Sequence, residues 1–116
     1  VYRFHPDGSG EVVAEAREER LESFHGLRYP HTDIPKQARA LYLRNRFRII
    51  SDVNAAPVPI EPDEAVGEGL DLGMSTLRAV SPIHIEYLKN MGVQASLSIS
   101  IIVRGELWGL FACHHY

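Results

Sequence analysis

The sequence predicts one α+β domain in which helices flank an antiparallel sheet. Three observations support this class. Strand-like runs and two helix-like segments are mixed along the chain, and most of the connections between them are short. A length of 116 residues with 45% hydrophobic content is enough for one core and too short for two. We therefore expect residues 1–116 to form a single domain.

Composition excludes several classes of function. Twelve Lys and Arg residues against fifteen Asp and Glu residues give a formal net charge of −3, which leaves no basic field for a phosphate backbone. No apolar run in the sequence approaches the roughly 20 residues of a membrane helix. The single cysteine, Cys113, has no partner for an internal disulfide. We expect a cytoplasmic protein with neither a nucleic-acid partner nor a membrane segment.

The chain begins with a hairpin pattern. Strand-like residues 1–4 and 11–17 flank a turn cluster of Pro, Asp, Ser and Gly, and this arrangement places Tyr2 and Phe4 on one face. The sequence starts without Met in one strand-like run and stops at Tyr116 in another. We expect a fragment of a larger protein, with a sheet that is truncated at both ends.

The first helix is indicated by Pro35, which suits a first helical position, and by apolar residues that recur at helical spacing up to Tyr42. These signals predict a helix over residues 35–44. A short strand is expected over 48–53. Residues 54–73 are rich in Pro, Gly and acidic side chains without any period, so we expect a long surface loop there.

The second helix has clear end signals. Ser81 is a suitable N-cap, Pro82 fits the first turn, and Gly92 can adopt the left-handed conformation that ends a helix. We expect one face of this helix to carry His84, Tyr87, Leu88 and Met91.

A final hairpin is predicted from residues 93–103 and 106–115. A two-residue turn would pair Val103 with Glu106 and would place His114 on the face opposite Ser96 and Ser98, whereas a three-residue loop with Gly105 left-handed would pair Ile102 with Glu106. The bulged register is favoured because it separates a small, polar face from an apolar face that we expect to be core. The polar face would carry Ser96, Ser98, Ser100, Ala112 and His114; the apolar face would carry Leu97, Ile99, Ile101, Leu107, Phe111 and Cys113.

Chemical motifs are few. A metal site made from Asp33, His84, His114 and His115 is conceivable, but the sequence has neither paired cysteines nor an H-E-x-x-H motif. Cys113 is placed on the expected core face, where a thiol is usually inert. Composition and spacing alone therefore lead only to a soluble α+β domain with a polar pocket, and we expect no metal and no catalytic residue.

Three ordered stretches resemble the chromophore-binding GAF domains of phytochromes, and of bacterial phytochromes in particular. The first is YPHTDIP at residues 29–35, with Gln37, Ala38 and Arg39 after it. The second is SPIHIEYLKNMGV at residues 81–93, and the third is LWGLFACHH at residues 107–115. The resemblance implies a GAF-type fold and the binding of a linear tetrapyrrole that isomerises when it absorbs red or far-red light.

The resemblance also assigns roles to single residues. Asp33 resembles the aspartate whose main-chain carbonyl accepts from the pyrrole nitrogens, and His84 the histidine beside the inner rings. Arg48 and Arg78 match the arginines that clamp the propionates, and His114 matches the histidine bonded to the outer-ring carbonyl. The remaining expected pigment contacts are Ile34 of the Asp-Ile-Pro string, the hydroxyl partners Ser96 and Ser98, and the aromatic residues Tyr2, Tyr29, Tyr42 and Tyr87.

Each of these residues also has a plain structural interpretation. The planar guanidinium of Arg48 or Arg78 matches a carboxylate, yet either arginine could be a solvated charge. His84 beside Tyr87 could be a satisfied core histidine, and Asp33 could cap the helix that follows it, which is worth about 1 kcal/mol. Only the motifs favour the functional interpretation over these structural ones.

Attachment of the pigment is a separate question. In plant and many cyanobacterial phytochromes a cysteine immediately precedes the helix histidine, and Ile83 occupies that position here. The resemblance then implies biliverdin, linked to a cysteine that precedes this fragment. It also implies flanking PAS and PHY domains, a homodimer, and a histidine kinase as output. Two rival hypotheses remain: a non-photochemical GAF domain that binds another ligand or mediates dimerisation, and an enzyme with a His and Asp metal centre.

Overall fold

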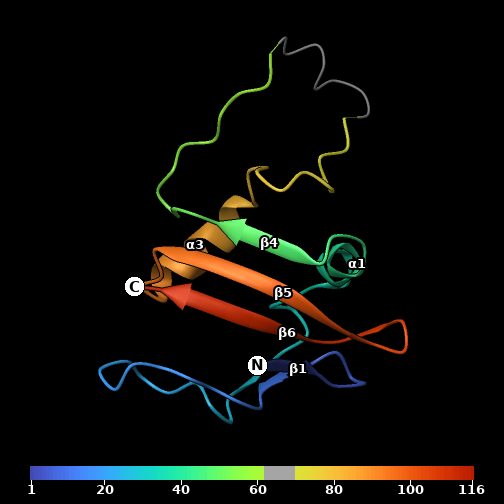
Figure 1. The fold of residues 1–116 in the computed structure, drawn as a ribbon, viewed down its shortest axis with the longest axis vertical. Coiled ribbons are helices and arrows are strands. Elements are labelled where there is room, and N and C mark those ends of the chain that lie inside the picture. The colour runs from blue at the N-terminus through green and yellow to red at the C-terminus, as the bar shows by residue number, and fades with distance from the viewer. Residues whose placement is uncertain (62–69) are drawn as a thin grey trace. The chain divides into compact units, whose positions relative to one another are not determined.

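The structure, a computed structural model, describes residues 1–61 and 70–116 (Figure 1). Within them, six strands form one sheet in the order β3-β2-β1-β6-β5-β4, and two helices accompany it. This arrangement confirms the predicted α+β class with an antiparallel sheet. The elements are β1 (Tyr2–Phe4), β2 (Gly10–Val12), β3 (Arg28–Tyr29), α1 (Lys36–Arg44), β4 (Phe47–Ile50), α3 (Pro82–Asn90), β5 (Ala95–Val103) and β6 (Glu106–His115).

The N-terminal hairpin forms as predicted, although its second strand is shorter than expected. β1 pairs antiparallel with β2, with Tyr2 opposite Val12 and Phe4 opposite Gly10. The rings of Tyr2 and Phe4 lie edge to face at 5.3 Å, which confirms that they share a face. A Cβ atom at Gly10 would lie 1.9 Å from the Tyr2 ring, so only glycine leaves room for this aromatic side chain.

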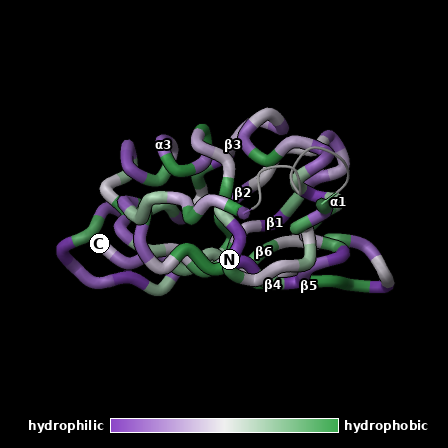
Figure 2. Tube along the Cα trace, turned by 90° about the horizontal axis from the view of Figure 1, so that it is seen from above, coloured by the Kyte–Doolittle hydropathy of each residue, from purple (hydrophilic) through white to green (hydrophobic). Residues whose placement is uncertain are grey.

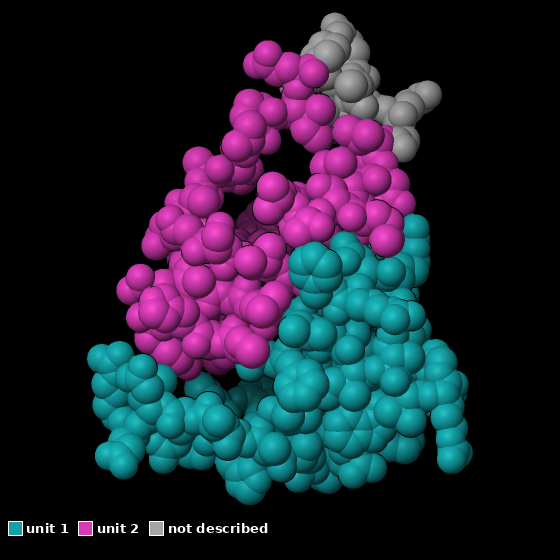
Figure 3. Space-filling model, in the orientation of Figure 1, with its two compact units in different colours: residues 1–47, 98–112 teal, residues 48–97, 113–116 magenta. Residues whose placement is uncertain are grey.

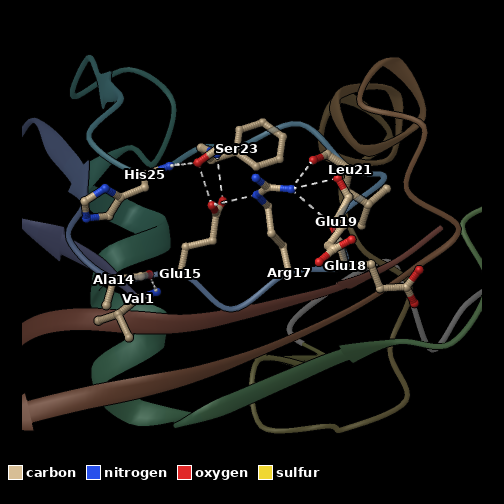
Figure 4. Close-up of polar contacts among 10 residues, drawn as sticks. Val1, Ala14, Glu15, Arg17, Glu18, Glu19, Leu21, Ser23 and His25 are labelled. Atoms are coloured by element: carbon tan, nitrogen blue, oxygen red, sulfur yellow. Dashed lines mark hydrogen bonds and ion pairs between the residues drawn. The ribbon is translucent and has the colours of Figure 1, made fainter.

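The segment between β2 and β3 is held by polar contacts rather than by repetitive structure (Figure 4). The carboxylate of Glu15 accepts hydrogen bonds from the Ser23 hydroxyl and from the main-chain nitrogen of Phe24, each at 2.7 Å. These bonds lower the pKa of Glu15. One guanidinium nitrogen of Arg17 donates to three main-chain carbonyls, the shortest bond being that to Leu21 at 2.6 Å. The sequence did not predict β3, which has only two residues.

The first helix, α1, agrees with its prediction except at the start. Pro35 is the N-cap and not the first helical residue, and its carbonyl oxygen accepts from the nitrogen of Arg39. The strand that follows, β4, is shorter than the predicted 48–53. Between β4 and α3, the described residues form neither helix nor strand, in agreement with the predicted loop; residues 62–69 of that prediction lie outside the described residues.

The second helix, α3, has the expected ends. Ser81 is the N-cap, but its main-chain carbonyl, and not its hydroxyl, accepts from the nitrogens of His84 and Ile85. Gly92 ends the helix with φ of 73°. Apolar and polar residues alternate along α3 (Figure 2). Its apolar side packs into a small core made of Ile50, Val53, Leu88 and Val93.

The turn between β5 and β6 differs from the favoured prediction. β5 extends to Val103 and β6 begins at Glu106, and the two residues between them have positive φ, 52° at Arg104 and 81° at Gly105. Two left-handed residues are typical of a two-residue hairpin turn. The predicted three-residue loop is therefore wrong, because the chain places the non-glycine residue Arg104 in the left-handed region.

The burial of this hairpin also corrects the prediction. Ser96 and Ser98 are each only 6% exposed, whereas Ile99 is 41% and Phe111 49% exposed. Cys113 is exposed as well, so the buried, inert thiol expected at this position is wrong. Within β5 the alternation of side chains still separates Ser96 and Ser98 from Ile99, but it does not determine which of these two faces other elements cover. Here the serines are covered.

The chain divides into two compact units (Figure 3). Unit 1 contains Val1–Phe47 and Ser98–Ala112, and unit 2 contains Arg48–Leu97 and Cys113–Tyr116. Among the described residues, neither helix has the length and hydropathy needed to cross a bilayer.

Candidate functional site

Unit 2 brings together three of the residues predicted to bind the pigment. Arg48 lies on β4, His84 in the first half of α3 and His114 near the end of β6. The guanidinium nitrogen Nη2 of Arg48 lies 3.0 Å from Nε2 of His84, across 36 residues of sequence. No spacing rule could have found this contact, because it depends on how β4 and α3 pack. We call Arg48, His84 and His114 the basic cluster.

The contact between Arg48 and His84 fixes the state of the imidazole. A guanidinium has only donors and keeps its charge, so the bond requires an unprotonated Nε2 that accepts from Arg48. His84 is therefore the neutral tautomer that carries its proton on Nδ1. The ring of Tyr87, one turn further along α3, stacks on the imidazole with centroids 6.3 Å apart and planes 19° apart.

Electrostatics agree with this assignment. Burial lowers the pKa of His84 from 6.5 to about 4, with further contributions from the positive charge of Arg48 and from repulsion by His114 when His114 is protonated. Burial alone lowers the pKa of His114. Both imidazoles are thus neutral near pH 7 and can each offer one donor and one acceptor.

His114 has a polar atom without a partner. Its Nδ1 is buried and has no hydrogen-bond partner among the residues that the structure describes. An unpaired buried nitrogen costs free energy, and a ligand group that forms a hydrogen bond with it would remove that cost. The guanidinium of Arg48, which contacts His84, is suited to binding a carboxylate. The cluster therefore fits a ligand that carries an acid for Arg48 and a second polar group for His114.

The other predicted residues of unit 2 lie as follows. Ser96 is buried on β5. Arg78 lies in the loop before α3, and its guanidinium donates to the carbonyl oxygen of Ser75 at 2.8 Å. The structure brings together Arg48, His84, His114 and Tyr87, and it holds Arg78 through its own loop.

Unit 1 contains the remaining predicted residues. The ring of Tyr2 lies 6.0 Å from that of Tyr29, which extends the aromatic pair with Phe4. Asp33 is exposed in the turn before α1, and its main-chain nitrogen donates to the carbonyl of Pro30 at 3.2 Å. The three other predicted residues are more covered: Ile34 is partly buried, and Ser98 and Tyr42 are each 6% exposed.

One residue that sequence reasoning left out of the site supports Tyr42. The hydroxyl of Ser100 donates to the main-chain carbonyl of Tyr42 at 2.7 Å, and the main-chain nitrogen of Ser100 donates to the carbonyl of Arg46. Ser100 thereby ties the end of α1 to β5 within unit 1. The Ser-x-Ser-x-Ser pattern of β5 was a signal for it, but only the first two serines were assigned a role.

The sequence matches the GAF domain family over residues 1–116. The chain belongs to the GAF domain family. It is 60% identical to a bacteriophytochrome of Pseudomonas aeruginosa and 54% identical to one of Xanthomonas campestris, over 99% and 100% of this chain. The matched region is 16% and 19% of those relatives, so the chain spans less than a fifth of their length.

Solved structures agree. The chromophore-binding domain of Stigmatella aurantiaca phytochrome P1 superposes with a TM-score of 0.89 at 52% identity, over 98% of this chain and 38% of that one. These relatives confirm that the chain resembles phytochrome GAF domains, as the three motifs predicted, and that the fold is that of a phytochrome chromophore-binding domain.

Proposed function

We propose that this chain is the pigment-binding module of a red/far-red photoreceptor and that its pigment is a linear tetrapyrrole. The observation that supports this most directly is the basic cluster. It combines a guanidinium, two half-buried neutral imidazoles and an orphaned buried nitrogen, Nδ1 of His114. A bilin supplies acids for the first and a carbonyl for the last. When bound, it supplies light absorption and isomerisation about a double bond.

Biliverdin is the proposed pigment. Ile83 precedes His84 on α3, at the position where a cysteine would attach other bilins. The only cysteine of the chain, Cys113, is exposed and next to His114 in a strand, so the two side chains point to opposite faces. We propose attachment through a cysteine outside this sequence.

The full photoreceptor would contain PAS and PHY domains on either side of this chain and would act as a cytoplasmic homodimer. Its output is proposed to be a histidine kinase that responds to the isomer of the pigment. This part of the proposal rests on the resemblance to phytochromes, because the chain covers less than a fifth of the bacteriophytochromes that it matches.

The test is a spectrum. Biliverdin added to the intact apoprotein should give a red-absorbing holoprotein whose spectrum shifts reversibly under red and far-red light. A free-pigment spectrum that does not respond to protein or light would contradict the proposal. His84→Gln should alter the red absorption band. His25→Gln, a control on the surface of unit 1, should leave that band unchanged.

The rival is a GAF domain without photochemistry. It would bind a smaller acid at Arg48 and leave added biliverdin free in solution. The third hypothesis, a metal enzyme, predicts stoichiometric metal in elemental analysis. No group of three or more His, Cys, Asp or Glu side chains within the described parts of the chain is arranged to hold a metal ion.

A further inference from the structure

The bond between Arg48 and His84 makes two states of the site mutually exclusive. Arg48 donates to Nε2 of His84 at 3.0 Å, and a guanidinium cannot accept a hydrogen bond. A proton on Nε2 would point directly at the guanidinium. His84 can therefore be protonated at Nε2 only after Arg48 has moved away from it.

A carboxylate ligand would draw Arg48 in that direction. Carboxylates form bidentate, charge-assisted bonds with a guanidinium, and these are stronger than a single bond to a neutral imidazole. We propose that Arg48 is exchanged between His84 and the carboxylate of an incoming ligand, so that ligand binding frees Nε2 of His84 and is coupled to proton uptake there. This inference rests on the proposed function, because it requires a ligand that carries an acid.

The surroundings of His84 support the coupling. The charged and titratable groups that act on it are Arg48 from β4 and His114 from β6, and Tyr87 stacks on it from α3 itself. Both basic groups lower its pKa, so neutralising one of them with a ligand acid raises that pKa. Linkage is reciprocal: if the acid favours protonated His84, a proton on His84 favours binding of the acid.

The first experiment needs no ligand. The pKa of His84 is followed by NMR in the intact apoprotein labelled in its histidine rings, with the His84 signal assigned by its loss in His84→Gln. Arg48→Gln should raise the pKa of His84 by about one unit or more, since a charge at hydrogen-bond distance is removed. Arg48→Lys keeps a positive charge at this position and should return the pKa of His84 most of the way to its native value. This variant distinguishes the loss of the charge from poor folding of the glutamine variant. Arg46→Gln, two residues earlier, should leave the pKa unchanged.

The second experiment compares two pigments. Biliverdin and its dimethyl ester share the tetrapyrrole, but only the first has free carboxylates. With both pigments bound, His84 should titrate at a higher pH in the biliverdin complex than in the ester complex. Equal pKa values in two bound complexes, or no effect of Arg48→Gln in the apoprotein, would overturn the exchange alone. Failure of biliverdin to bind would count against the proposed function instead.

Discussion

Acid should loosen α3 because His84 is neutral in the folded protein and protonated when it is exposed. Its pKa is lowered from 6.5 to about 4, mainly by burial, then by the charge of Arg48 and by repulsion from His114 when His114 is protonated. Between these two pH values the unfolded segment binds a proton that the folded segment does not. The free energy of unfolding therefore decreases as the pH falls through 6.5 and stops decreasing below about 4.

The size of the effect follows from the same two values. A pH of 5 lies about 1.5 units below the pKa of 6.5 that His84 has when it is exposed. At 1.36 kcal/mol per unit, the free energy of unfolding is then lower by about 2 kcal/mol. The ring is only half-buried, and water screens part of the charge, so we expect about 1 kcal/mol. That is roughly a fivefold increase in the open population of α3.

The assay is native-state hydrogen exchange of the intact apoprotein, read on a peptide that covers residues 82–93. The ratio of exchange rates in native protein and in His84→Gln, taken at the same pH, removes the intrinsic pH dependence of exchange. This ratio should rise about fivefold between pH 7 and pH 5. The exposed His25 is the matched control, and His25→Gln should exchange like the native protein in this peptide. A ratio that stays constant with pH would show that His84 is not buried in the neutral form.

Three further outcomes are expected. Cys113→Ser should leave covalent attachment of the pigment intact, checked by zinc fluorescence of the denatured protein; loss of the fluorescent band would make Cys113 the linkage. Asp33→Ala should retain pigment binding, for which only the main-chain carbonyl is needed, but should block formation of the far-red state, because the resemblance to phytochromes implies that the exposed carboxylate makes a contact in that state; a normal photocycle would contradict this role. Gly109→Ala should destabilise the pairing of β1 with β6 by about 1–3 kcal/mol, since the new Cβ would lie 2.3 Å from the carbonyl oxygen of Tyr2. Unchanged amide exchange in β1 would refute this last expectation.

Local signals predicted the helices well. Pro82 and Gly92 mark the ends of α3 because a missing donor and a left-handed residue act within one turn of chain. The same kind of reasoning failed at the β5–β6 turn. The favoured three-residue loop did not require Arg104 to be left-handed, a conformation that costs about 1–2 kcal/mol for a residue other than glycine. The pairing of the two long strands offsets this cost. β3 was missed because two residues carry no period.

Long-range features of the site could be predicted only in part. The resemblance led us to expect Arg48, His84 and His114 individually as pigment contacts, but nothing in a 36-residue separation indicates that a guanidinium donates to an imidazole. The alternation of polar and apolar residues in β5 likewise could not predict which face of the strand is covered. Ser96 is less exposed than Ile99, the reverse of what hydropathy suggests, because coverage depends on the elements that pack on the strand and not on the strand itself.

The chemistry of the basic cluster narrows the class of ligand further than the motifs do. Arg48 and His114 both oppose a positive charge on His84, so each proton or cation added to this site is disfavoured and each anion is favoured. A phosphate polymer is ruled out by the net charge of −3, which repels it from the protein as a whole. A small organic acid would satisfy Arg48 and leave the buried Nδ1 of His114 unpaired. A ligand that satisfies both needs an acid for Arg48 and a separate polar group that pairs with Nδ1 of His114, and a bilin carries groups of both kinds, which supports the pigment hypothesis over the rival GAF hypothesis.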